Sequence, residues 1–153
     1  MSLVIGIDPG LTGALALLDG ERCLELEDMP VADGRVSAPI LGDLLLGWGE
    51  AYGHEMRVIL EDVAARPGQG VSSMFKFGRC VGAVEGVVGS LNLPLVYVTP
   101  ARWKRSAGLT GREKDASRRK ALELWPERHR QLRRKKDNGR AEALLIGHFG
   151  TVR

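Results

Sequence analysis

The chain has 153 residues, of which 44% are hydrophobic and 27% are charged, and its formal net charge is +3 at pH 7. These values are typical of a soluble globular protein and exclude a disordered or collagen-like chain. No apolar run reaches the roughly 18 residues that a membrane helix needs, and no signal-peptide pattern opens the sequence. The two cysteines, Cys23 and Cys80, form no CxxC pair, which excludes a zinc ribbon and a disulfide scaffold. We therefore expect a cytoplasmic protein with no membrane partner, built as a single domain over residues 1–153.

Short apolar runs and helical periodicities alternate along the chain. Runs bounded by Gly, Pro and Asp predict strands, and apolar residues at a spacing of three and four predict helices. In chain order we expect strands at 3–7, 12–18 and 22–26, a helix at 39–52, a strand at 57–60, a helix at 72–91, a strand at 95–98, and helices at 114–125 and 138–149. This order indicates an α/β fold with a mixed five-stranded sheet flanked by helices.

The charge is distributed unevenly between the two parts of the chain. Residues 1–98 carry 6 Lys and Arg against 13 Asp and Glu, whereas residues 99–140 carry 15 Lys and Arg against 5 Asp and Glu. A strongly basic segment in a small domain favours an anionic polymer as partner, nucleic acid first. A solvated pair of basic helices would give the same pattern, so charge alone does not decide between the two.

Acidic residues follow the predicted strands at positions suited to a site. Asp8 ends the first strand and Glu61 ends the fourth, and ligands of open α/β sheets bind beyond the carboxyl ends of the parallel strands. Asp137 and Glu142 lie at the start of the last helix. Four carboxylates without a cluster of His or Cys suit Mg²⁺ or Mn²⁺. Taken singly, Asp8 could simply close a turn, and Asp137 could be an N-cap.

Three motifs follow one another along the chain: GIDPG at 6–10, LEDV at 60–63 and AEALL at 141–145. They resemble those of the RuvC-like Holliday-junction resolvases of the RNase H-like superfamily, which include a phage type, and the likeness runs from about residue 3 to 149. The resemblance implies an RNase H-like fold and a structure-specific endonuclease that depends on divalent metal ions. Such an enzyme resolves four-way DNA junctions by paired symmetric cuts in DNA recombination and repair. It also implies branched DNA as substrate, a homodimer, and two Mg²⁺ or Mn²⁺ ions in each active site.

The resemblance transfers unevenly from residue to residue. Asp8, Glu61 and Glu142 match three catalytic, metal-binding acids, but glycine stands at position 139, where better-known members carry the fourth. Asp137 is the expected substitute for that fourth catalytic acid and metal ligand.

The resemblance also points to DNA-binding residues. Lys104 and Lys114 match basic positions along the substrate, and Arg102 opens the basic segment beside them. Ala64 replaces an aromatic residue that stacks at the junction in cellular members. Stacking would then fall to Phe75 or Phe77 or be absent, and both phenylalanines could instead belong to the core or to a dimer interface.

Glycines recur every fourth residue in the second predicted helix, at positions 78, 82 and 86. This smooth face suits either the dimer interface or close packing on the chain's own sheet. Two other functions stay open: a YqgF-type RNA-processing nuclease, which shares the fold and the opening motif, and a non-catalytic nucleic-acid-binding module.

Overall fold

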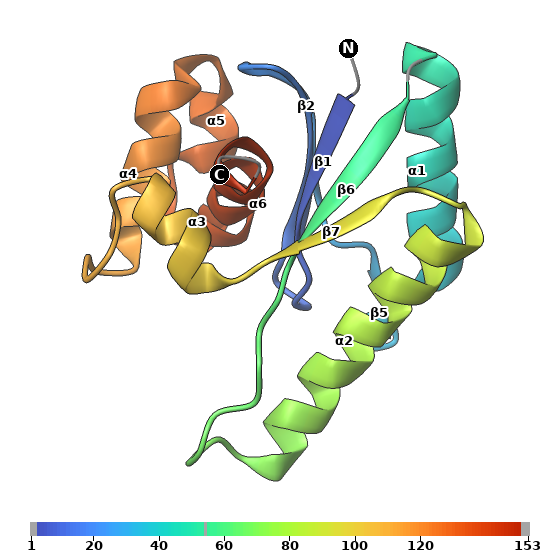
Figure 1. Cartoon of the computed structure of the whole chain (residues 1–153), viewed down its shortest axis with the longest axis horizontal. Coiled ribbons are helices and arrows are strands. Elements are labelled where there is room, and N and C mark those ends of the chain that lie inside the picture. The colour runs from blue at the N-terminus through green and yellow to red at the C-terminus, as the bar shows by residue number, and fades with distance from the viewer. Residues whose placement is uncertain (1–2, 54, 151–153) are drawn as a thin grey trace.

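A mixed sheet with strand order β3-β2-β1-β6-β7 forms the centre of the computed structural model, which describes residues 3–53 and 55–150 (Figure 1). The strands are β1 (Leu3–Asp8), β2 (Ala14–Asp19), β3 (Arg22–Asp28), β6 (Met56–Glu61) and β7 (Leu95–Val98). Strands β1, β2 and β3 pair antiparallel, whereas β1, β6 and β7 pair parallel. A separate small ribbon joins β4 (Val31–Ala32) to β5 (Arg35–Val36). The predicted α/β class with a mixed five-stranded sheet is confirmed.

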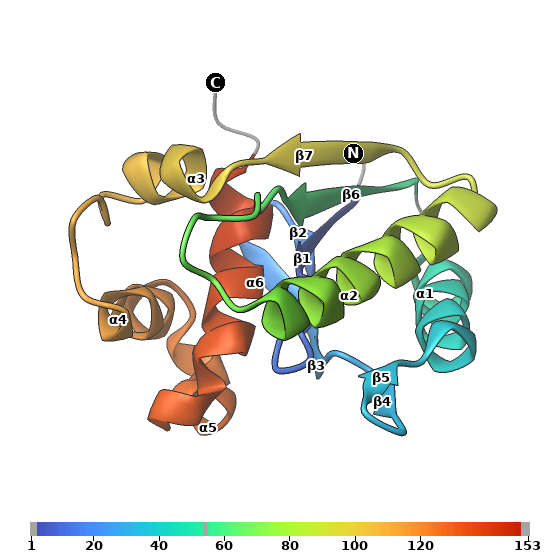
Figure 2. The ribbon, with the colours of Figure 1, turned by 90° about the horizontal axis from the view of Figure 1, so that it is seen from below.

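Helices cover both faces of this sheet (Figures 1 and 2). On one face lie α1 (Ala38–Tyr52) and α2 (Val71–Ser90). On the other lie α3 (Pro100–Ser106), α4 (Asp115–Leu124), α5 (His129–Leu132) and α6 (Asn138–Phe149), with short 3₁₀ turns at Pro126–Arg128 and Lys135–Asp137. The short elements β4, β5, α3 and α5 were not predicted, because none of them is long enough to show a clear hydrophobic period.

Strand alternation decides which side chains of β1 face which layer. Ile5 and Ile7 pack in the core under α1 and α2, so Val4, Gly6 and Asp8 face the layer that contains α6. In β6, Ile59 faces the same layer as Val4, and Glu61 follows two residues later. Asp8 and Glu61 therefore leave adjacent parallel strands on the side of α6.

Helix α6 lies directly on the backbone of β1. A Cβ atom at Gly6 would lie 2.2 Å from the carbonyl oxygen of Ala143 and 2.5 Å from the amide nitrogen of Gly147. Only glycine at position 6 permits this approach. The two backbones are thus in contact, and the start of α6 is held beside the carboxyl end of β1.

Part of the basic segment serves the fold. The Arg128 guanidinium donates to the carbonyl oxygens of Cys23 (2.8 Å) and Leu24 (3.0 Å), and the Gln131 amide donates to that of Leu26 (3.0 Å). These bonds satisfy the free carbonyls of the edge strand β3, which would otherwise be open to pairing with another chain. Hence not every cation between residues 99 and 140 is available to a polymer.

Two further expectations concern the surroundings of the protein. None of the described helices is long and apolar enough to span a bilayer. Cys23 and Cys80 are free thiols. The cytoplasmic location stays a prediction.

Candidate active site

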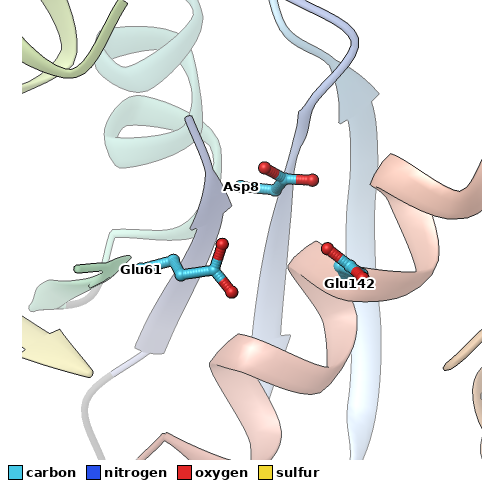
Figure 3. Close-up of side chains that lie close together, drawn as sticks. All are labelled: Asp8, Glu61 and Glu142. Atoms are coloured by element: carbon cyan, nitrogen blue, oxygen red, sulfur yellow. The ribbon is translucent and has the colours of Figure 1, made fainter. Parts of the chain in front are cut away.

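Three carboxylates meet beyond the carboxyl ends of β1 and β6. Asp8, Glu61 and Glu142 each offer a carboxylate oxygen, and these oxygens all lie within 4.8 Å of one another. Figure 3 shows the two strand residues and the helix residue directed into one space. Three of the four predicted acids are therefore brought together, from elements separated by up to 134 positions in sequence.

Each acid is positioned by a different local feature. Asp8 is the last residue of β1 and Glu61 the last of β6, so strand alternation aims both at the same layer. Glu142 lies one turn inside α6, where the Gly6–Gly147 contact holds the helix against β1.

Glu61 also has a buried hydrogen-bond donor. The indole nitrogen Nε1 of Trp103 donates to its Oε2 atom over 2.6 Å, and Trp103 is 0% exposed. Trp103 therefore lies in the core, and its only polar side-chain atom is bonded to a carboxylate of the site.

Burial and mutual repulsion perturb these acids. Desolvation, followed by the negative charges of Glu142 and Glu61, raises the pKa of Asp8 from 3.8 to about 7. Desolvation also raises the pKa of Glu61, although the hydrogen bond from Trp103 and the charge of Lys104 act in the opposite direction. Like charges held this closely are costly unless a cation or a proton neutralises them.

The donor set matches a hard divalent cation. It consists of carboxylate oxygens alone, and no His or Cys joins the group within the described part of the chain. Oxygen ligands of this kind suit Mg²⁺ or Mn²⁺ better than zinc. Burial first, and then the charges of Glu142 and Glu61, raise the pKa of Asp8, and a bound cation would neutralise the charge that these groups share.

Asp137, the fourth predicted acid, lies outside this group. It is 3% exposed, and its Oδ1 accepts a hydrogen bond from the Arg134 guanidinium at 3.0 Å and lies 3.6 Å from that of Arg140. Its Oδ2 accepts from the backbone N–H of Arg134 at 2.9 Å. Burial alone would raise the pKa of Asp137, but the bonds from Arg134 outweigh it and hold the pKa below its usual range. These contacts suit a structural role in which Asp137 anchors the segment before α6. Its role as a metal ligand stays a prediction.

Position 139 has a steric reason to be glycine. A Cβ atom there would lie 2.2 Å from the carbonyl oxygen of Thr12 and 3.2 Å from Cα of Gly13. The turn between β1 and β2 therefore occupies the space that an acidic side chain at 139 would need.

The predicted DNA-binding residues surround the acids to different degrees. Lys114 is exposed and lines a cavity of about 460 Å³ together with Asp8 and Glu142, and its charge acts to lower the pKa of Asp8. Lys104 lies with its Nζ 5.4 Å from the centre of the Trp103 ring. Arg102 is exposed on α3.

Phe77, which the sequence analysis offered for stacking, lines the cavity alongside Asp8. Two other lining residues from α2, Ser73 and Lys76, were missed. Their only signal was their place in the first turns of the helix that follows the Glu61 loop. Trp103 was also missed; its signal was that a tryptophan placed in a core needs an acceptor for its indole N–H.

The glycine face of α2 does not pack on the sheet. Gly78, Gly82 and Gly86 are exposed, and a Cβ atom added at any of them would meet nothing within 4 Å. Phe75, on the same face, is 65% exposed, whereas Phe77 is half-buried and lines the cavities beside both Asp8 and Glu61. Packing on the chain's own sheet is thus excluded for these glycines.

Three solved structures of RuvC and of a Holliday junction resolvase are similar to this chain in fold. A structure of Thermus thermophilus RuvC in complex with a Holliday junction substrate is similar with a TM-score of 0.65 and 20% identity, covering 97% of this chain and 92% of that one. The chain has the fold of a RuvC resolvase. Another T. thermophilus RuvC structure gives a TM-score of 0.65 at 20% identity, with 96% and 92% of the two chains covered.

The yeast mitochondrial Holliday junction resolvase Ydc2 is also similar, with a TM-score of 0.53, 15% identity, and 95% and 76% of the two chains covered. No protein-family model matches the chain, and no curated protein matches it. The RuvC-like architecture inferred from three short motifs is confirmed as a fold.

Proposed function

We propose that this protein is a divalent-metal-dependent endonuclease that cuts four-way DNA junctions by paired phosphodiester hydrolysis, acting as one nuclease domain over residues 1–153. The carboxylate group of Asp8, Glu61 and Glu142 carries the proposal, because it lies on the RuvC fold with basic helices beside it. The fold alone would also suit a binding module, but a module that only binds an anionic polymer has no use for three clustered acids.

The three acids would hold Mg²⁺ or Mn²⁺, with two ions as the expected number. The ions would activate a water molecule and stabilise the leaving oxygen of the cleaved phosphodiester. The carboxylates supply the negative charge that retains the ions, and burial strengthens this attraction by lowering the local dielectric.

Basic side chains near the acids would hold the DNA. Lys114 and Lys76 line the same cavity as Asp8 and are suited to neutralise phosphates on either side of the cleaved bond. Lys104 and Arg102, from α3, would extend this contact along a DNA arm. Each phosphate neutralised contributes to a binding constant that falls with salt.

We further propose a homodimer built on the exposed face of α2. That face combines open glycines with the exposed side chains of Phe75 and Val71, which is unfavourable in water. A two-fold dimer would present two sites to a two-fold symmetric junction, as paired cutting requires.

Oligomeric state tests this interface. We expect Gly82→Arg to convert a dimer to a monomer in sedimentation, while Gly47→Arg leaves it a dimer. Gly47 is the matched control because it is also an exposed helical glycine, in α1, with nothing within 4 Å of an added Cβ. Equal sedimentation of the two variants would remove α2 from the interface.

A cleavage assay tests the activity. The purified protein, with Mg²⁺ or Mn²⁺, is offered a four-way junction, linear duplex, flap DNA and an RNA–DNA hybrid of matched sequence, with Asp8→Asn as the control. We expect symmetric cuts in the junction and none by the variant. Cleavage of the hybrid with the junction left intact would replace the resolvase by a ribonuclease, and no metal-dependent cleavage of any substrate would leave a binding module.

A further inference from the structure

The hydrogen bond between Trp103 and Glu61 joins a buried neutral side chain to a carboxylate of the site. Trp103 is 0% exposed, and its Nε1 donates to Glu61 Oε2 over 2.6 Å. An indole has one N–H and no acceptor, so this bond uses the full polar capacity of the ring. The bond takes one lone pair of Glu61 Oε2 and fixes that oxygen, so the carboxylate keeps its other lone pairs for a ligand.

The ring itself is held from several directions. Trp103 belongs to the core formed by α3, α4, α6 and the sheet, and Lys104 lies over its ring. A side chain packed in this way does not rotate when a ligand arrives. The position of Glu61 Oε2 is therefore fixed before any cation binds.

We propose that Trp103 is a positioning residue for the metal site: its indole fixes Glu61 with one oxygen presented to the metal ions. This inference rests on the proposed function only in taking Glu61 as a metal ligand. Without the bond, Glu61 would have to be ordered by the incoming cation, and the desolvated Oε2 would lack a donor.

Trp125 provides a matched comparison within the same chain. It is also buried, at 1% exposed, and its Nε1 donates over 2.9 Å, but to the backbone carbonyl of Glu21, at the opposite end of the sheet from the acids. Replacement of either tryptophan by phenylalanine removes one buried indole N–H and keeps an aromatic ring in the core. Only Trp103→Phe removes a bond to a carboxylate of the site.

Metal affinity is the decisive measurement. By calorimetric titration of the intact protein with Mn²⁺, we expect Trp103→Phe to bind about 10- to 100-fold more weakly than wild type, the range for partners that orient metal ligands. We expect Trp125→Phe to bind like wild type. The Mn²⁺ concentration for half-maximal cleavage should rise in the same proportion for Trp103→Phe, while junction binding without metal stays unchanged. Wild-type Mn²⁺ affinity in Trp103→Phe, or an equal loss in both variants, would overturn the proposal.

A second measurement uses the unmodified protein and does not depend on the folding of Trp103→Phe. The chain has three tryptophans, so ¹⁵N labelling gives three indole N–H resonances, and Trp48→Phe and Trp125→Phe assign that of Trp103 by elimination. Titration with Mg²⁺ should move the Trp103 resonance and leave the other two in place. A stationary Trp103 resonance, while calorimetry shows that Mg²⁺ binds, would refute the positioning role. Neither titration uses DNA, so a failure of the junction assay is distinguishable from a failure of this inference.

Discussion

Replacement of Asp8 by asparagine should stabilise the metal-free protein while it abolishes cleavage. The pKa of Asp8 is raised from 3.8 to about 7, first by desolvation and then by Glu142 and Glu61. The folded protein therefore retains a proton on Asp8 that the unfolded chain releases. The asparagine side chain of the variant would carry no charge at any pH, so the variant avoids the cost of ionising this position.

The size of the effect follows from the difference between the two pKa values. A difference of about 3 corresponds to at most about 4 kcal/mol, at about 1.36 kcal/mol for each pKa unit. Solvent screening at the open cavity reduces this bound, and we expect about 2 kcal/mol, or a rise in melting temperature of about 4–8 °C.

The direction with pH is fixed by linkage. Below about pH 4 Asp8 is protonated in both the folded and the unfolded state, so the wild type and Asp8→Asn should be equally stable. As the pH rises from about 4 to about 7, the unfolded wild type gains stability relative to the folded one, and the advantage of the variant grows to its full size. In excess Mg²⁺ the wild type should be the more stable of the two proteins. The ion stabilises the wild type by binding to it, whereas the variant lacks one of the metal ligands.

Urea unfolding in EDTA between pH 4 and 8, repeated at pH 8 with Mg²⁺, measures these differences. Junction binding by the variant should persist without metal, which separates loss of chemistry from loss of affinity. An Asp8→Asn variant that is less stable than wild type at pH 8 in EDTA would refute the reasoning that burial and the neighbouring acids disfavour an ionised Asp8 in the folded state.

Three further predictions concern the neighbourhood of the site. Asp137→Asn should lower the free energy of unfolding by about 1–3 kcal/mol in urea, because it weakens a buried ion pair. Most cleavage activity per folded molecule should remain. Loss of activity at full stability would instead make Asp137 a metal ligand. Gly139→Asp should cost about 1–3 kcal/mol or more, since the turn at Thr12 blocks its Cβ, and should not raise activity; a stable variant with higher activity would contradict this steric account. Lys114→Gln should reduce the salt dependence of junction binding by about one phosphate contact. Arg22 is an exposed cation at the other end of β3, and Arg22→Gln should leave the salt dependence unchanged. An equal change in both variants would show non-specific attraction.

The sequence predicted the parts of the fold that depend on local pattern. The apolar run at 3–7 and the helix at 138–149 match β1 and α6 because long or strongly apolar elements show a clear period. The acids Asp8, Glu61 and Glu142 were found for the same reason, since each follows directly from its place at the end of a strand or the start of a helix.

The rest depended on tertiary contacts that no local pattern records. The sequence shows that Asp137 follows four cations, but not that Arg134 folds back onto its buried carboxylate. Nor does it show that the indole of Trp103 meets Glu61, 42 positions away.

The contact between Gly6 and Gly147 can keep the spacing of the acids constant while the rest of the sequence changes. Because α6 meets β1 through backbone atoms, the separation of Asp8 from Glu142 does not depend on the shape of any side chain between the two elements. Substitutions elsewhere in the core can then accumulate and change stability while the spacing of these two acids is retained. A chain that is 20% identical to T. thermophilus RuvC can thus keep the same fold. Glycine at positions 6 and 147 therefore leaves the core side chains around them free to change.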